Sequence, residues 1–115
     1  MHTRLPLHAA SLLLALATSA CASAPGATVT VFKHLGSKQC SGGGQTVPEL
    51  AKVLSDAGVP VLAQRCGSDG RMYPAMCGAA DGRIGAFDIA ATQAEAAARL
   101  GFRPLGPDAR VQPCP

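Results

Sequence analysis

Aromatic residues are scarce in this sequence, and tryptophan is missing. The 115 residues include three phenylalanines and one tyrosine, so a folded core has to be built from valine, leucine, isoleucine and alanine. Clusters of basic residues are missing as well: ten lysines and arginines are scattered among seven acids, for a net charge of +3. Since nucleic-acid binding requires a basic patch, the composition argues against a nucleic-acid partner.

Groups that carry out catalysis are equally few. Beyond residue 20 the sequence has a single histidine, His34, and its cysteines form no Cys-x-x-C motif. Nucleophilic catalysis needs a base beside the nucleophile, and thiol redox catalysis commonly uses a low-pKa thiol in that motif. The glycine-rich segment Ser41–Gly44 is not followed by the Gly-Lys-Ser/Thr of a phosphate-binding P-loop. We therefore expect a protein that is not an enzyme and that carries no cofactor.

The clearest motif is an export signal. A short start containing Arg4 leads into the apolar run Ala9–Ala17, and the small residues Thr18–Ala20 precede Cys21. This is the order of a secretory signal peptide, which we assign to residues 1–20. The apolar run is far shorter than the roughly 20 residues that a membrane-spanning helix needs.

The end of the signal, Ser19-Ala20-Cys21, resembles the lipobox of bacterial lipoproteins. The resemblance implies that Cys21 is lipidated, becomes the mature N-terminus and anchors the protein in the membrane. Ala22 differs from the aspartate of the inner-membrane retention signal in that family, which implies an outer-membrane lipoprotein that faces the periplasm. Thr18 stands where the pattern prefers leucine, and cleavage after Ala22 would instead leave a soluble periplasmic protein.

Removal of residues 1–20 leaves about 95 residues, enough for one small domain. Residues 21–27 are small and contain proline and glycine, so we expect a flexible tether. A small α+β domain is predicted for residues 28–105, followed by an irregular, proline-containing tail at residues 106–115. A domain of this size has a small core, and disulfides are the usual reinforcement in oxidising compartments.

Two helices are predicted from matching start and stop signals. The segment Thr46–Glu49 is a capping box ahead of an apolar stripe at helical spacing, and Gly58 ends that helix. The segment Thr92–Glu95 is a second capping box, and Gly101 ends the second helix.

Strand signals flank both helices. The predicted strands are Thr28–Leu35, Val59–Leu62, Arg83–Ile89 and Phe102–Leu105. The resulting βαββαβ order predicts a ferredoxin-like fold: a four-stranded antiparallel sheet with two helices on one face, stapled by disulfides.

Four cysteines, an even number, remain once Cys21 is set aside. In the predicted fold, the loop that holds Cys40 and the long hairpin that holds Cys66 and Cys77 lie at the same end of the sheet. Four cysteines allow three disulfide pairings, and the sequence does not choose among them. This arrangement makes two of them possible: Cys40–Cys77 with Cys66–Cys114, or Cys66–Cys77 with Cys40–Cys114. Each bridge is expected to contribute about 2–4 kcal/mol of stability.

Three groups of proteins resemble parts of the sequence. Most of the chain is similar to small uncharacterised lipoproteins of the Gram-negative cell envelope, which implies no known activity. The duplicated layout, with residues 87–105, resembles the SPOR domain, which implies binding to peptidoglycan. Residues 66–77, Cys-Gly-Ser-Asp-Gly-Arg-Met-Tyr-Pro-Ala-Met-Cys, resemble a segment of Kazal protease inhibitors, although the other cysteines of that family are missing.

These observations predict a non-enzymatic binding or structural module of the cell envelope, with peptidoglycan or an envelope protein as its partner. The contact surface is expected at the end of the domain that the disulfides staple. The candidate binding residues there are Gly42, Gly43, Gly44, Gln45, Arg71 and Tyr73. The N–H groups of the glycine segment precede a helix, where they are suited to hold a carboxylate or phosphate.

Two alternative functions use the same region. The first is a periplasmic metal-binding or thiol-redox protein, because thiolate and thioether ligands suit a soft metal such as Cu(I). Its ligands would come from Cys66, Cys77, Met72, Met76 and His34. The second is protease inhibition by the Kazal-like segment.

Overall fold

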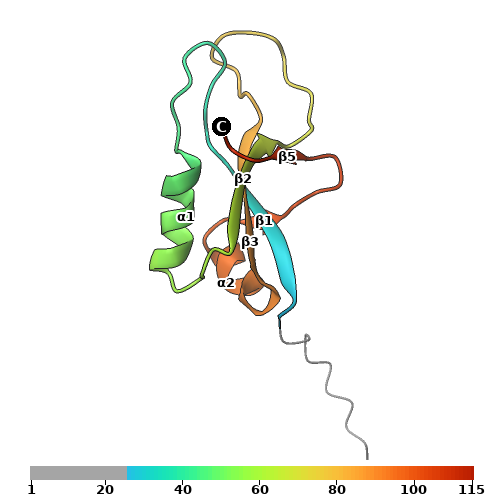
Figure 1. Cartoon of the computed structure of the whole chain (residues 1–115). Helices are drawn as coiled ribbons and strands as arrows, with labels where there is room; N and C mark the ends of the chain where they lie inside the picture. Colours follow the sequence, from blue (N-terminus) through green and yellow to red (C-terminus); the bar gives the residue numbers. More distant parts are fainter. Residues whose placement is uncertain (1–25) are drawn as a thin grey trace, which may run out of the picture.

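The computed structural model describes residues 26–115, so the predicted signal peptide, Cys21 and most of the tether lie outside the described residues. The described chain forms five strands, two α-helices and a 3₁₀ turn (Figure 1). In chain order they are β1 (Thr28–His34), α1 (Val47–Asp56), β2 (Ala63–Ser68), β3 (Arg83–Ala90), η1 (Ala91–Gln93), α2 (Ala94–Arg99), β4 (Arg103–Pro104) and β5 (Arg110–Gln112).

All five strands pair antiparallel in one sheet with the order β4-β1-β3-β2-β5. The prediction of an α+β fold with an antiparallel sheet and two helices is confirmed. The sheet has five strands where the sequence predicts four, because residues 110–112 of the tail predicted to be irregular pair with β2. A three-residue edge strand is too short to show an alternating pattern.

The main core lies on one face of this sheet. Val31 of β1 is paired with Phe87 of β3, and both belong to a buried cluster with Leu50 and Leu54 of α1 and Ala97 of α2. Because successive strand residues point to opposite faces, both helices cover the face that carries Val31 and Phe87. The alternate residues of β1 and β3 point to the other face, where the candidate site lies.

Helix α1 has the start and the stop that the sequence predicts. The Thr46 hydroxyl accepts a hydrogen bond from the Glu49 N–H, and the Glu49 carboxylate accepts one from the Thr46 N–H at 2.7 Å. At the other end Gly58 has a φ of +81°, and the Val59 N–H donates to the Leu54 carbonyl in a Schellman motif. These bonds satisfy backbone groups that the helix ends leave free.

The second capping box does not form. Ala91–Gln93 wind into a 3₁₀ turn directly after β3, so Thr92 lies inside a turn and Gln93 becomes the N-cap of α2 without a side-chain hydrogen bond. The predicted end of this helix is correct, since Gly101 has a φ of +87° directly after the C-cap Leu100. The sequence motif is the same in both helices, but the preceding backbone differs.

Substitution of the two box threonines is expected to separate these cases. Thr46→Ala removes the N-cap acceptor and should lower the free energy of unfolding by about 1 kcal/mol. Thr92→Ala removes no cap and should change it by less than about 0.5 kcal/mol. Urea unfolding of both variants measures the difference, and equal losses would show that Thr92 caps α2 after all.

Strand β2 begins at Ala63, beyond the predicted Val59–Leu62. Val59 is held in the C-terminal cap of α1, and Pro60 has no N–H to donate to a sheet. Leu62 is the first residue of this segment to join the sheet, through its N–H to the Asp88 carbonyl at 2.9 Å. The last predicted strand starts later for a similar reason, because the Phe102 N–H donates to the Ala97 carbonyl at the end of α2, and β4 begins at Arg103.

Two disulfides staple the domain: Cys40–Cys77 and Cys66–Cys114. They are the first of the two pairings that the predicted topology allows. The second bridge joins the end of the chain to β2, directly after β5, while the first joins two loops beyond the sheet.

Candidate functional site

A segment of the chain crosses the sheet on the face away from the helices. Strands β4 and β5 lie at opposite edges of the sheet, so the chain between them has to pass over β1, β3 and β2. We call residues 106–109 of this connection the strap. The strap lies over Phe32 of β1 and Ile84 of β3, which point away from the helix-covered face.

Two glycines allow the C-terminal segment to approach the β2 side of the sheet closely. A Cβ atom added at Gly67 would lie 2.1 Å from the carbonyl oxygen of Arg110, and one at Gly70 would lie 2.1 Å from that of Asp108. Any side chain at either position would therefore push the strap or β5 away.

The strap and the sheet enclose a cleft of about 800 Å³. The apolar side chain exposed at its floor is that of Phe32, which is half-buried, while Ile84 is fully buried. Cationic side chains lie around this floor. The lining residues besides Phe32, Ile84 and the strap are Lys33, His34, Asp69, Gly70, Arg71, Gly101, Arg103 and Pro104.

Asp69 lies in the wall of the cleft nearest to β2 and holds three neighbouring groups by hydrogen bonds. Its carboxylate accepts hydrogen bonds from His34 Nε2 at 2.8 Å, from the Tyr73 hydroxyl and from the Arg71 N–H at 2.9 Å. Only 6% of its side chain is exposed. Burial alone would raise the pKa of Asp69, but the hydrogen bonds from Tyr73, His34 and Arg71 outweigh it and lower the pKa below its ordinary value. The hydrogen bond between the Tyr73 hydroxyl and the Asp69 carboxylate raises the pKa of Tyr73.

Asp69→Asn is expected to make the protein less stable by about 1–3 kcal/mol at pH 7, because it removes a charged acceptor of three hydrogen bonds. A carboxyl with a lowered folded-state pKa stabilises above its unfolded pKa of about 3.9, and this contribution disappears as the pH falls through the folded value. The stability difference between wild type and Asp69→Asn should therefore shrink below about pH 4. Urea unfolding at pH 7 and pH 3 tests this; a difference independent of pH would contradict it.

Beyond the cleft, residues 36–45 and 69–82 form two loops at one end of the molecule (Figure 1), and we call them the stapled loops. The Cys40–Cys77 disulfide joins them. The Gln39 side chain braces the second loop: its amide nitrogen donates to the carbonyls of Pro74 at 2.7 Å and Ala80 at 3.1 Å, and its oxygen accepts from the Met76 N–H at 3.1 Å. The loops are therefore fixed to each other by covalent and polar contacts.

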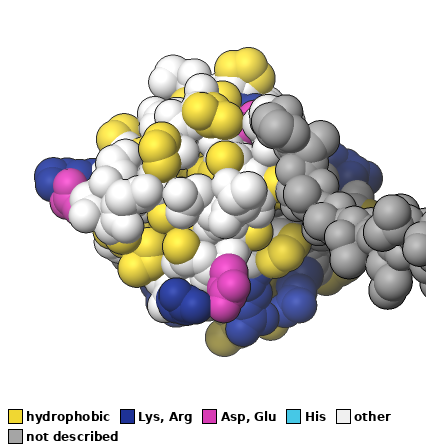
Figure 2. Space-filling model, turned by 90° about the horizontal axis from the view of Figure 1, so that it is seen from below, with side chains coloured by type: hydrophobic (Ala, Val, Ile, Leu, Met, Phe, Trp, Pro, Cys, Tyr) yellow, Lys and Arg dark blue, Asp and Glu magenta, His cyan; other side chains and the backbone are white. Residues whose placement is uncertain are grey.

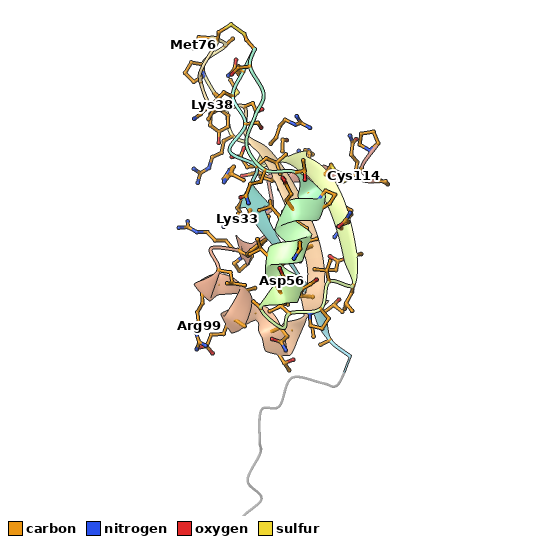
Figure 3. The ribbon with its side chains drawn as sticks, turned by 90° about the vertical axis from the view of Figure 1, so that its left-hand side faces the viewer. Lys33, Lys38, Asp56, Met76, Arg99 and Cys114 are labelled. Atoms are coloured by element: carbon orange, nitrogen blue, oxygen red, sulfur yellow. A yellow bond between two sulfur atoms is a disulfide. The ribbon has the colours of Figure 1, made fainter. Side chains whose placement is uncertain are left out.

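Large hydrophobic side chains are exposed on the second stapled loop. Met72 is 98% exposed and Met76 is 61% exposed. Figure 3 shows Met76 at the far tip of the molecule, well beyond the end of the sheet. Leu62 is the other large exposed hydrophobic residue of the described chain, at 59%, and it lies at the opposite end of β2.

The predicted binding residues all lie in the stapled loops, and the structure distributes them within this end. Arg71 lines the cleft, while Tyr73 packs against the position of Gly82 and bonds to Asp69. Residues 42–45 lie in the first loop, where the N–H groups of Gly42 and Gln45 donate to the carbonyls of Lys38 and Leu35.

An external anion is not needed at the start of α1. The Glu49 carboxylate accepts from both the backbone N–H and the hydroxyl of Thr46, and these hydrogen bonds, the backbone one first, lower the pKa of Glu49. The start of α1 was predicted to hold an external carboxylate or phosphate. In the structure the carboxylate of Glu49 binds there instead. Within the predicted binding segment 42–45, the N–H groups of Gly43 and Gly44 donate to no backbone carbonyl of residues 26–115.

The soft-metal ligands of the alternative prediction are not brought together. Cys66 and Cys77 are in disulfides with different partners, Met72 and Met76 point to solvent, and His34 is hydrogen-bonded to Asp69. Among residues 26–115 no three His, Cys, Asp or Glu side chains gather in a cluster suited to a metal ion.

Sequence reasoning missed three parts of this region. Asp69 was covered only as part of the Kazal-like segment 66–77, Arg103 only as part of a strand, and the strap only as irregular tail. The contacts of Asp69 with His34 span 35 positions, and no local motif predicts them. A usable signal for the floor was the alternation of Phe32 with Val31 in β1, which places the two side chains on opposite faces.

Comparison with known proteins finds no matching family model, curated protein or solved structure. Within the part of the chain that the structure describes, no helix has the length and apolar character needed to cross a bilayer. The two disulfides are compatible with an extracytoplasmic location.

Proposed function

We propose that this protein is an exported, lipid-anchored module of the cell envelope that binds an envelope protein through its stapled loops. The observation that carries the proposal is the exposure of Met72 and Met76 on a loop that Gln39 and a disulfide hold in place. Methionine adapts to many apolar partner surfaces. A loop that is already ordered loses little conformational entropy on binding, which favours affinity.

The direction of the chain supports this assignment. Strand β1 begins at the end of the molecule opposite to the stapled loops (Figure 1). A lipid on Cys21, a few residues upstream, would hold that end at the membrane and present the stapled loops away from it. Figure 2 views the end where β1 begins, and its visible hydrophobic side chains are scattered rather than gathered in one patch.

The chemistry of the exposed residues favours a protein over peptidoglycan as the partner. Glycan strands are polar and are commonly bound by hydrogen-bonding groups and aromatic rings, whereas the most exposed large side chain here is an apolar methionine. Methionine is enriched in the cores of protein–protein interfaces relative to the rest of the protein surface.

The strand order also supports the finer fold prediction. We propose that β1 to β4, in the order β4-β1-β3-β2, form a ferredoxin-like unit with α1 and α2, and that β5 is an addition at the free edge of β2. Because β5 pairs at this edge, the strap that leads to it crosses the face of the sheet away from the helices, which we call the open face.

Site-specific photo-crosslinking in intact cells tests the contact surface. A diazirine amino acid is placed at position 72 of the full chain, and at position 62 as the matched control, because both wild-type side chains are large, apolar and exposed. We expect a discrete protein adduct from position 72 and none from position 62. The same adduct from both positions, or no adduct from position 72, would contradict the proposal; an adduct with glycan would identify peptidoglycan as the partner instead.

A further inference from the structure

We propose that the cleft under the strap is a binding site for a small carboxylate with a planar apolar body. The cleft has a volume of about 800 Å³ and is formed by three separate parts of the chain: the open face of the sheet, the segment after β2 and the strap. Small-molecule sites typically measure about 300–1,000 Å³ and combine an apolar lining with a few polar groups. The cleft under the strap has this composition.

Two arginines supply the recognition of a negative charge. Arg71 and Arg103 both line the cleft, and neither guanidinium forms an ion pair or a side-chain hydrogen bond with any residue of 26–115. By contrast Arg65 is paired with Asp88 at 2.6 Å and Arg99 with Glu95 at 2.8 Å. Guanidinium groups bind carboxylates through paired, charge-assisted hydrogen bonds, so the two unpaired arginines favour an anionic group in this cleft.

The acids that line the cleft do not satisfy these arginines. The carboxylate of Asp69 already accepts hydrogen bonds from His34, Tyr73 and a backbone N–H. Asp108 lies on the strap, and no ion pair to its carboxylate exists among the described residues. The remaining cation, Lys33, is engaged at the cleft edge, where its Nζ donates to the Leu100 carbonyl at 3.1 Å.

The floor determines which kind of anion fits. Phe32 presents a half-buried aromatic side chain to the cleft, whereas Ile84 in the floor has no exposed surface. The Phe32 ring meets the His34 ring edge-on at 5.5 Å between centroids. An aromatic ring in the ligand would pack against the Phe32 ring, since aromatic pairs stabilise each other at such distances. Inorganic phosphate would engage the arginines but leave the apolar floor uncovered.

This inference does not rest on the proposed function. The cleft is lined in part by the start of the second stapled loop, Asp69–Arg71, but neither Met72 nor Met76 lines it. A protein partner on the loops and a small carboxylate in the cleft are therefore distinguishable, and either proposal can fail alone.

A ¹⁵N NMR titration with 3-phenylpropionate tests the cleft. The full chain is secreted as the Cys21→Ser variant, which carries no lipid. We expect saturable shifts of amide signals around the cleft, including His34, Gly70 and Ala109. Arg103→Ala should weaken binding at least about tenfold, the effect of losing a charge-assisted hydrogen bond. Arg99→Ala is the matched control, because Arg99 is an exposed arginine on α2 outside the cleft, and it should leave the affinity unchanged.

Two further ligands define the chemical class. 3-Phenylpropanamide has the same body without the charge and should bind at least about tenfold more weakly; inorganic phosphate alone should give no saturable shifts at the floor. The proposal is overturned if Arg103→Ala and Arg99→Ala bind the carboxylate alike, or if phosphate binds as tightly as 3-phenylpropionate. An unchanged dispersion of the amide spectrum shows that each variant is folded, and Arg103→Gln replaces Arg103→Ala if it is not.

Discussion

Replacement of Cys66 and Cys114 by alanine is expected to lower the free energy of unfolding by about 3–4 kcal/mol. The two residues are 48 positions apart, so the disulfide removes much of the conformational freedom of the unfolded chain. For a domain of this size the loss corresponds to a fall in Tm of roughly 15–25 °C. Thermal unfolding followed by circular dichroism measures it.

The Cys40–Cys77 pair provides the comparison. Its sequence separation is 37, and the entropic effect depends only on the logarithm of loop length, so the cost in stability should be nearly the same. The local effects should differ: loss of Cys66–Cys114 releases β5 and the strap, whereas loss of Cys40–Cys77 releases the stapled loops. In the variant without Cys66 and Cys114, the β5 amides should exchange much faster than the other amides of the domain. In the variant without Cys40 and Cys77 they should not. Equal exchange of β5 in both would contradict this division.

Gly67→Ala is expected to cost about 2–3 kcal/mol, although it adds one methyl group. The added Cβ would lie 2.1 Å from the Arg110 carbonyl oxygen and 3.0 Å from the Cα of Val111. Backbone atoms cannot move aside as a flexible side chain does, so β5 has to leave its register with β2, with the strain of an overpacked site. Urea unfolding measures the loss.

Gly106→Ala is the matched control within the strap. A Cβ at Gly106 meets no atom within 4 Å, and its backbone is outside the left-handed region. The substitution should therefore change stability by less than about 0.5 kcal/mol. If Gly67→Ala were equally harmless, the close contact between β2 and β5 would not contribute to the fold.

The parts of the fold that the sequence predicts correctly depend on neighbouring residues. The start of α1 at Thr46 and its end at Gly58 each involve hydrogen bonds over a few positions, and both are confirmed. Thr92 shows the limit of this reasoning, because the same motif has no cap when β3 runs directly into a 3₁₀ turn. A capping box therefore forms where its threonine keeps the extended backbone of an N-cap, as Thr46 does, and not where the threonine lies inside a turn.

The parts that were not predicted depend on distant residues. Strand β5 exists because Gly67 leaves room for it and Cys114 is tied to Cys66, and none of these relations is visible near residues 110–112. The cleft wall depends on Asp69 meeting His34 across 35 positions. Arg71 is among the predicted binding residues, but nothing near it in the sequence indicates that it lines the same cleft as Arg103.

Intact-mass spectrometry of the protein isolated from its native membrane tests most directly whether it is an exported, anchored and disulfide-stapled module. The measurement reports the N-terminus, the acyl groups and the number of free thiols together. We expect a chain that begins at Cys21, carries acyl groups on that residue and has no free thiol, since the other four cysteines are paired. A mature chain that begins at Ser23 or later without lipid would contradict the anchoring, and free thiols would contradict the staples.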